Sequence, residues 1–169
     1  AVIAAAGTPG GFRAYDKLEN IDGTAMVGRM IESFRLAGVE DIVVVTGYRA
    51  RETEKSLAKR GVVFLRREDY ETVEMLDFVK DGLAYLEKSC DRIFFCPADV
   101  PLFTEETLKK MAEHKADVVV PLYEGRKGPP ILFDTPLADV IMAYPGERGL
   151  KGAIDGSGAE VSLVTVGEK

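Results

Sequence analysis

Short apolar runs recur along the chain, and glycine, proline or charged residues end each of them. The first run covers residues 1–6 and breaks into a glycine-rich stretch at 7–11. Several later runs are rich in valine and isoleucine, which favour strands. Because these runs are apolar throughout rather than alternating, they are typical of strands buried on both faces in a parallel sheet. The pattern predicts strands at 1–6, 41–47, 62–65, 93–96, 117–121 and 161–166.

Between these strands, apolar residues recur at the three- and four-residue spacing of helices. Met26, Met30 and Phe34 mark one such stripe, and Thr104 followed by two glutamates has the features of a helix cap. The pattern predicts helices at 24–37, 50–59, 73–87 and 104–114. The alternation of strand and helix predicts right-handed crossovers and therefore a parallel sheet.

Length and composition predict one domain over residues 1–169, with a substantial core. Hydrophobic residues make up 46% of the chain and charged residues 30%, the balance of a soluble globular protein. Cys90 and Cys96 are expected to be reduced thiols, because Cys96 lies within an apolar run. A single histidine, His114, supports neither a His-rich zinc site nor a His-dependent triad.

The net charge of −6 argues against a nucleic-acid partner, since no basic cluster offsets it. An acidic protein that handles phosphates is expected to recruit a divalent cation. No apolar stretch approaches the roughly 20 residues that a membrane span needs, and no signal peptide is visible. We therefore expect a cytoplasmic protein without a membrane partner, and the sequence leaves its oligomeric state open.

The candidate chemistry begins where the first apolar run ends. Three glycines within residues 7–11 allow a tight turn that brings backbone N–H groups close to a ligand, and Lys17 follows nearby. Such donors suit a polyphosphate at the carboxyl end of a strand, where open α/β sheets bind ligands. The spacing fits neither the dinucleotide-binding fingerprint nor the P-loop. An ordinary glycine-rich turn is the alternative from composition alone.

A second candidate site follows the apolar run at 93–96. Asp99 stands just beyond that run, so its carboxylate is placed to meet a ligand at the carboxyl edge of the sheet. Magnesium is often held by one or two carboxylates together with substrate phosphates. Asp99 is therefore a candidate Mg²⁺ ligand, and the alternative is that it caps a turn before Pro101.

The opening stretch resembles the signature of the MobA-like NTP transferases, a family that includes the enzymes attaching GMP or CMP to the molybdenum cofactor. The usual pattern, AAG-x-x-x-R-M-G-x-x-x-K, fits the spacing from Gly7 to Lys17. The family's arginine falls on Gly11, and the glycine after it falls on Arg13. Either Arg13, two residues after Gly11, takes over the contact with the phosphates, or phosphate binding is weakened.

Later segments resemble the same family in the right order along the chain. The stretch GVEDIVVVTGY reads like the family's second strand, PADVP like its Gly-Asp-Met-Pro, and PGERGLK like its Gly-Asp-Arg-Gly-Ala-Arg. The chain departs from the family at Glu74, which replaces a glycine, at Asp77, near serine positions, and at Pro129, which replaces a histidine. The family's closing aspartate motif is absent from the sequence.

The resemblance implies a three-layer α/β/α sandwich with a mixed, mostly parallel sheet, related to the nucleotide-diphospho-sugar transferases and Rossmann-like. It also implies a set of site residues. Asp99 would bind Mg²⁺, and Arg13 and Lys17 would be catalytic. The remaining candidates are nucleotide contacts, at Ala5, Ala6, Gly7, Thr8, Gly10 and Gly11, and acceptor contacts, at Arg126, Lys127, Arg148 and Lys151.

The implied reaction is nucleotidyl transfer. NMP from a nucleoside triphosphate, GTP or CTP, would move to a phosphorylated acceptor, either a molybdopterin-type cofactor or a phosphosugar, with release of pyrophosphate. Two other interpretations of the function remain open. A glycosyltransferase would use a related sheet but usually carries Asp-x-Asp where this chain has Pro97-Ala98-Asp99. A non-catalytic nucleotide-binding or regulatory domain would account for the departures from the family pattern.

Overall fold

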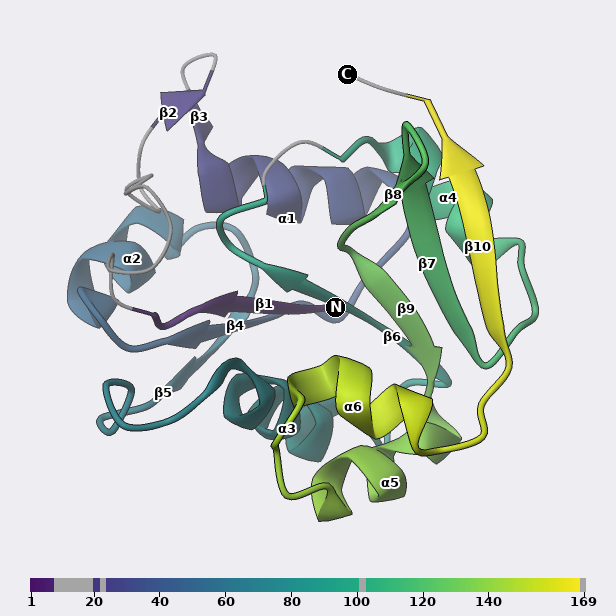
Figure 1. Ribbon diagram of the computed structural model, residues 1–169. Coiled ribbons are helices and arrows are strands. Elements are labelled where there is room, and N and C mark those ends of the chain that lie inside the picture. The colour runs from purple at the N-terminus through teal and green to yellow at the C-terminus, as the bar shows by residue number, and fades with distance from the viewer. Residues whose placement is uncertain (8–19, 22–23, 101–102, 168–169) are drawn as a thin grey trace.

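The computed structural model describes residues 1–7, 20–21, 24–100 and 103–167. Its main element is an 8-stranded sheet with the order β10-β7-β9-β6-β1-β4-β5, and β8 pairs with β7 outside this path. Figure 1 shows the strongly twisted sheet with helices on both sides. The strands of this sheet are β1 (Val2–Ala5), β4 (Val43–Thr46), β5 (Val63–Arg66), β6 (Arg92–Pro97), β7 (Val118–Tyr123), β8 (Arg126–Lys127), β9 (Ile131–Asp134) and β10 (Val161–Val166).

The sheet is mixed but mostly parallel, as expected. Strand β1 pairs in parallel with β4 and β6, β4 pairs in parallel with β5, and β10 pairs in parallel with β7. The exception is β9, which runs antiparallel between β6 and β7. A separate two-stranded ladder joins β2 (Asn20–Ile21) and β3 (Thr24–Ala25).

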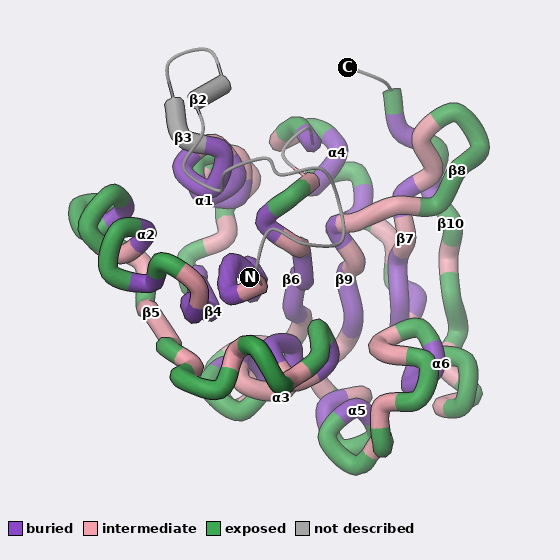
Figure 2. The backbone as a smooth tube through the Cα atoms, turned by 60° about the vertical axis from the view of Figure 1, so that its left-hand side comes forward, coloured by how far each residue is buried: buried purple, intermediate pink, exposed green. Residues whose placement is uncertain are grey.

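Helices cover both faces of the sheet and complete three layers (Figure 2). One face is packed by α1 (Met26–Leu36), α2 (Ala50–Leu57) and α4 (Glu105–Ala112), and the other by α3 (Met75–Leu86), α5 (Ala138–Ala143) and α6 (Gly149–Asp155). A short 3-10 helix, Thr135–Leu137, leads into α5. The predicted α/β/α sandwich is therefore confirmed.

Strand β1 supplies side chains to both cores, because successive strand residues point to opposite faces. Ile3 and Ala5 belong to the core under α1 and α4, whereas Val2 and Ala4 belong to the core under α3. All of β1 is buried. The close packing of α3 on this strand depends on Gly82, where a Cβ atom would lie 2.4 Å from both methyl groups of Val2.

The predicted strands and helices are confirmed to within a few residues at their ends, and the structure contains elements that the sequence did not predict. The first predicted helix begins at Met26 because Thr24–Ala25 form β3. No strand was predicted for β8 or β9. No helix was predicted for α5 or α6.

Both cysteines are free thiols, as predicted, with Cys96 buried and Cys90 half-buried. Thr104 caps α4 as expected, since its side-chain oxygen accepts a hydrogen bond from the Thr107 N–H. None of the helices in the described part of the chain combines the length and the apolar composition of a bilayer-spanning helix.

Replacing Gly82 with alanine tests the contact between α3 and β1. The new methyl group would overlap Val2, and overpacking of this kind costs about 1–3 kcal/mol. That cost works against the gain in helix propensity of roughly 1 kcal/mol from glycine to alanine. We expect Gly82→Ala to lower the unfolding midpoint in urea, and Val2→Ala added to it to recover part of the loss.

Gly167→Ala is the matched control for this prediction, because a Cβ atom there would meet nothing within 4 Å. An unchanged or raised midpoint in Gly82→Ala, with Gly167→Ala behaving like the parent, would contradict close packing at this position.

Candidate nucleotide site at the carboxyl edge of the sheet

The carboxyl ends of β1, β4, β5 and β6 lie side by side and are joined beyond the strands by backbone hydrogen bonds. The Tyr48 N–H donates to the Ala6 carbonyl at 3.0 Å, and the Ala98 N–H donates to the Ala4 carbonyl at 2.9 Å. The Arg67 N–H donates to the Thr46 carbonyl at 2.8 Å. The first described residues beyond β4, β5 and β6 are therefore bonded to the neighbouring strands.

The glycine turn starts from the middle of this edge. Ala5 and Ala6 are buried, so their side chains serve packing. Gly7 is different, because a Cβ atom built on it would have no neighbour within 4 Å. The predicted nucleotide contacts at Ala5, Ala6 and Gly7 thus lie at the carboxyl end of β1. The other turn candidates, Thr8, Gly10, Gly11, Arg13 and Lys17, lie outside the described residues.

Asp99 lies on the same edge as the glycine turn. The parallel register pairs Ala4 with Pro97, and the Ala98 N–H donates to the Ala4 carbonyl, so Asp99 follows directly after the point where β6 ends beside β1. The side chain of Asp99 is exposed, while the preceding Ala98 is buried. The two strongest candidates from the sequence, the turn at Gly7 and the carboxylate of Asp99, are therefore brought to the ends of neighbouring strands.

The charge of Asp99 affects the buried thiol of Cys96. Burial raises the pKa of the Cys96 thiol well above its usual value, and the nearby Asp99 carboxylate raises it further. Cys96 therefore stays a neutral thiol behind the site, and its sulfur donates weakly to the Pro97 carbonyl at 3.4 Å. A thiol held in this state is not a nucleophile.

Asp99 is the carboxylate, among the described residues, that we expect to hold a divalent cation at this edge. Within that part of the chain, no group of three or more histidine, cysteine or acidic side chains is arranged to hold a metal. Magnesium is compatible with such a sparse site, because it usually keeps waters and takes one or two carboxylates together with substrate phosphates. The exposed carboxylate of Asp99, beside a turn suited to phosphates, fits that mode of binding.

Arg126 and Lys127 form β8 in a hairpin at the carboxyl end of β7. Glu124 and Gly125 join the two strands with φ values of 48° and 79°, the left-handed geometry of a tight hairpin turn. Both basic side chains are exposed. Strand β7 is separated from β6 by β9 alone, and neighbouring strands lie roughly 4.8 Å apart. The hairpin continues β7 beyond its pairing with β9, which covers only Val118 and Val119.

Arg148 and Lys151 lie in the helical layer that α3, α5 and α6 form on one face of the sheet. Arg148 directly precedes α6, and Lys151 is part of it. The turn before Arg148 packs on the start of α3, since a Cβ atom at Gly146 would lie 3.9 Å from the Leu76 side chain. Arg148 is exposed and contacts Asp155 at 3.3 Å, and Lys151 is exposed on α6. In the described part of the chain, no hydrogen bond or ion pair links the two basic pairs to Asp99.

Glu74 and Asp77, two departures from the family pattern, have a structural explanation. Glu74 is the N-cap residue of α3, and its backbone N–H donates to the Asp77 carboxylate at 2.9 Å. The two side chains form a reciprocal capping box, which satisfies backbone donors at the helix start. Acidic groups at this end also interact well with the helix dipole. These carboxylates are therefore used by the helix.

The sequence reading did not find the polar network formed by Thr46, Glu54 and Arg66. Arg66, at the end of β5, donates to Glu54 with both Nε and Nη2, and the buried Thr46 hydroxyl donates to the same carboxylate at 2.8 Å. The Arg66 guanidinium holds the pKa of Glu54 below its ordinary value. The side chains come from β4, α2 and β5, and only the folded chain brings them together.

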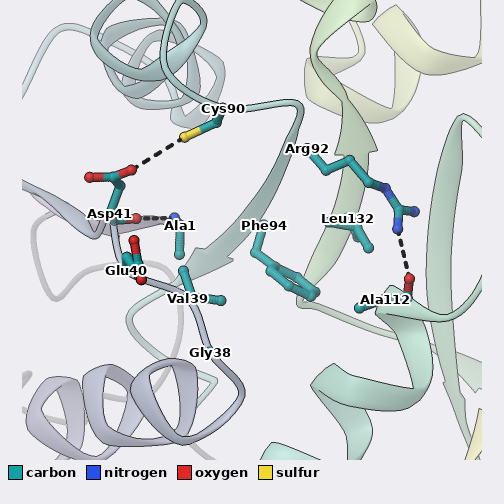
Figure 3. A pocket seen from close by; sticks show the side chains of 10 residues that line it. All are labelled: Ala1, Gly38, Val39, Glu40, Asp41, Cys90, Arg92, Phe94, Ala112 and Leu132. Atoms are coloured by element: carbon teal, nitrogen blue, oxygen red, sulfur yellow. Dashed lines mark hydrogen bonds between the residues drawn. The ribbon is translucent and has the colours of Figure 1, made fainter.

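A cavity of about 300 Å³ lies at the other end of the sheet and serves as a comparison (Figure 3). It lies at the amino ends of β1 and β6, with Ala1, Phe94 and Leu132 among its walls. Cys90 points to Asp41 on one side at 3.9 Å, and Arg92 donates to the Ala112 carbonyl on the other at 3.0 Å. None of the site residues predicted from the sequence lines this cavity.

Comparison with known sequences identifies the family. A sequence model described as the MobA-like NTP transferase domain matches residues 1–161. The chain belongs to this family. Nucleotidyl transfer is the activity of the family, and the resemblance seen in the sequence is confirmed.

Curated relatives match part of the chain. The bifunctional protein GlmU of Staphylococcus haemolyticus is 28% identical over 116 residues, which are 68% of this chain and 25% of GlmU. GlmU of Paracoccus denitrificans is 31% identical over 111 residues, 64% of this chain and 24% of GlmU. The matched region is thus about a quarter of the length of these relatives.

Solved structures share the whole fold. A nucleotidyl transferase from Methanothermobacter thermautotroptrophicus has a TM-score of 0.82 at 23% identity, covering 98% of this chain and 85% of its own. Rv0371c from Mycobacterium tuberculosis has a TM-score of 0.83 at 20% identity, covering 99% and 88%. A 4-diphosphocytidyl-2C-methyl-D-erythritol synthase has a TM-score of 0.74 at 17% identity, covering 97% and 86%. These likenesses confirm the nucleotide-diphospho-sugar transferase fold.

Glu54→Gln tests whether the charge in the Thr46–Glu54–Arg66 network stabilises the carboxyl edge. The folded-state pKa of Glu54 lies below its ordinary value of 4.5, so its charged form contributes stability above that pH. The contribution is lost as the pH falls through the lower folded-state pKa. We expect the variant to lose about 0.5–1 kcal/mol of unfolding free energy at pH 7. The difference from the parent should narrow toward pH 3 in urea titrations.

Glu71→Gln is the control, because it removes an exposed carboxylate to which the described structure gives no hydrogen bond or ion pair. A difference between Glu54→Gln and the parent that stayed constant with pH would show that shape, rather than charge, is what matters at position 54.

Proposed function

We propose that the protein transfers NMP from a nucleoside triphosphate, GTP or CTP, to a phosphorylated acceptor. The acceptor would be a molybdopterin-type cofactor or a phosphosugar. An oxygen of the acceptor phosphate attacks the α-phosphorus, and the bond from that phosphorus to the bridging oxygen of the β-phosphate breaks. Pyrophosphate is the leaving group. A cytoplasmic location remains a prediction.

The observation that carries the proposal is the convergence of Gly7 and Asp99 at the ends of neighbouring strands. Phosphoryl chemistry asks a protein mainly for alignment and for neutralisation of charge. A glycine-rich turn after β1 would offer N–H groups to the phosphates, and a carboxylate after the neighbouring strand would suit the cation that accompanies them. Membership of a nucleotidyltransferase family over residues 1–161 supports this use of the edge.

The chain's own groups would divide the work as follows. Backbone N–H groups of the turn from Gly7 to Gly11 and the Arg13 guanidinium would hold the triphosphate. Lys17 would neutralise charge that builds up on the α-phosphate and the acceptor. Asp99 would hold Mg²⁺, which orients phosphate oxygens and acts as a Lewis acid when bound.

The acceptor is proposed to meet basic side chains on either side of this edge. Arg126 and Lys127 project from a hairpin whose backbone is fixed by its turn and by pairing with β7. Arg148 and Lys151 stand on the opposite layer, at the start of α6. Both pairs are exposed, so either could contact an acceptor phosphate without losing a buried partner.

A non-catalytic nucleotide-binding domain is the second candidate. It is favoured because the described residues include no group of three or more histidine, cysteine or acidic side chains that could hold a metal ion. One argument for it has weakened, because Glu74 and Asp77 are used as a helix cap rather than placed as free charges. Turnover decides between the two candidates, since both require nucleotide binding.

The experiment is a pyrophosphate-release panel with four nucleoside triphosphates, molybdopterin-type and phosphosugar acceptors, and either Mg²⁺ or Mn²⁺. Manganese is included because Rv0371c was solved in complex with it. Release that depends on both an acceptor and a triphosphate supports the transferase. Binding by calorimetry without release from any combination would support the non-catalytic domain instead.

Asp99→Asn is expected to abolish metal-dependent turnover while leaving the unfolding midpoint unchanged, because the side chain is exposed and keeps its shape. Loss of the carboxylate removes the proposed metal ligand. Turnover is measured across a Mg²⁺ titration, with the exposed Glu71→Gln as a charge-matched control. An unchanged Mg²⁺ dependence in Asp99→Asn would remove Asp99 from the metal site.

Lys17→Met is expected to lower kcat on the order of 10²–10³-fold, the usual loss for one charge-stabilising donor. If Lys17 acts mainly in the transition state, triphosphate affinity should change little. Single-turnover rates and calorimetry on one preparation separate the two effects. A large loss of affinity at an unchanged single-turnover rate would assign Lys17 to binding alone.

A further inference from the structure

The turn between β4 and α2 contains a glycine that is covered by a side chain from another loop. A Cβ atom at Gly47 would lie 2.5 Å from the Cβ of Tyr70 and 2.8 Å from its Cγ. It would also lie 2.9 Å from the carbonyl oxygen of Ala6. These separations are far below van der Waals contact with atoms that cannot easily move aside. Position 47 therefore accepts glycine because Tyr70 and the end of β1 occupy the space of a side chain.

The same turn is fastened to its neighbours by further contacts. The Tyr48 N–H donates to the Ala6 carbonyl at 3.0 Å, and the rings of Tyr48 and Tyr70 meet edge-on with centroids 6.3 Å apart. Arg49 completes the turn in the left-handed region, with φ at 53°. Left-handed non-glycine residues persist where the surroundings hold them. The end of β1, the turn 47–49 and Tyr70 thus form one packed unit.

Tyr70 belongs to the segment 66–74, which links β5 to α3 along the carboxyl edge. The segment is anchored at its start, where Arg67 pairs with Asp69 and Asp81. It is anchored at its end by the capping box at Glu74. Between these anchors, the contact of Tyr70 with Gly47 draws the segment toward Ala6, one residue before the turn that opens at Gly7.

We propose that Tyr70 is a positioning residue for nucleoside triphosphate binding. Its ring, seated on Gly47, fixes the distance between the segment 66–74 and Ala6, the residue after which the chain leaves the end of β1 at Gly7. It acts through Gly47 and the Ala6 carbonyl and contacts no reacting atom. The inference rests on the proposed function of this edge as a nucleotide site.

Four variants test it: Tyr70→Ala, Tyr70→Phe, Gly47→Ala and the double variant Gly47→Ala/Tyr70→Ala. Removing the ring or forcing it away should raise the Kd and KM for the triphosphate about tenfold or more, because misplacement by an ångström is costly in such sites. We expect kcat to change much less, since the reacting groups are assigned elsewhere. Tyr70→Phe keeps the ring and should behave like the parent.

The double variant makes the test specific. Once the ring is gone, a methyl group at position 47 no longer meets it, so Gly47→Ala should add little to the loss already caused by Tyr70→Ala. Contacting residues show such non-additivity, whereas independent sites add. Tyr85→Ala, at an exposed tyrosine on α3, and Gly167→Ala, in open space, are the matched controls.

Triphosphate binding, together with hydrogen exchange of the protein without nucleotide, distinguishes failure of the proposed function from failure of the positioning role of Tyr70. Tyr70→Ala should speed amide exchange in residues 66–74, and Tyr85→Ala should not. A parent that binds no triphosphate overturns the proposed function, and this inference with it, even if exchange responds as expected. A parent that binds, together with a Tyr70→Ala variant of equal Kd and KM, overturns the positioning role alone. A lower unfolding midpoint with unchanged Kd would have the same meaning, because it assigns Tyr70 to stability only.

Discussion

The register of β1 between β4 and β6 is the constraint on which the rest of the structure depends. Ile3 lies opposite both Val44 and Cys96, and every residue of β1 is buried. A slip by one residue would exchange the side chains that point to the two cores, so packing on both faces fixes the register. That same register places the end of β6, two residues before Asp99, beside the end of β1, so core packing also fixes the relative positions of these two strand ends.

The parts of the fold that the sequence predicted are those whose signal is local. Valine- and isoleucine-rich runs indicate buried strands wherever they lie, and the apolar stripe of Met26, Met30 and Phe34 requires no knowledge of its partners. Gly7 and Asp99 could be paired from the sequence because both follow a buried strand, and parallel strands end at one edge. The short helix Ala138–Ala143 was not predicted because six residues are too few to show a helical spacing of apolar positions.

What the sequence could not reveal depends on contacts between distant segments. Gly47 reads as an ordinary strand-ending glycine, and only the position of Tyr70, 23 residues later, explains why no Cβ fits there. Glu74 and Asp77 stood out in the sequence only as departures from the family pattern, and the structure shows that they cap the start of α3. In both cases the residue type was visible from the sequence, and its partner was not.

Charge pairing around the carboxyl edge bears on how a polyphosphate could be held. Arg49, Arg66 and Arg67 all lie on this side of the sheet, but each is paired with a carboxylate, from Glu52, Glu54, and Asp69 with Asp81 respectively. Guanidinium groups that are paired with carboxylates help to hold the carboxyl edge of the sheet in place, but they supply little net positive charge to a ligand. Under the proposed function, the negative charge of a triphosphate would be met by backbone N–H groups, by Arg13 and Lys17, and by a cation on Asp99. In a protein of net charge −6, such a cation would be the largest of these contributions, so the proposal depends most on the carboxylate that follows β6.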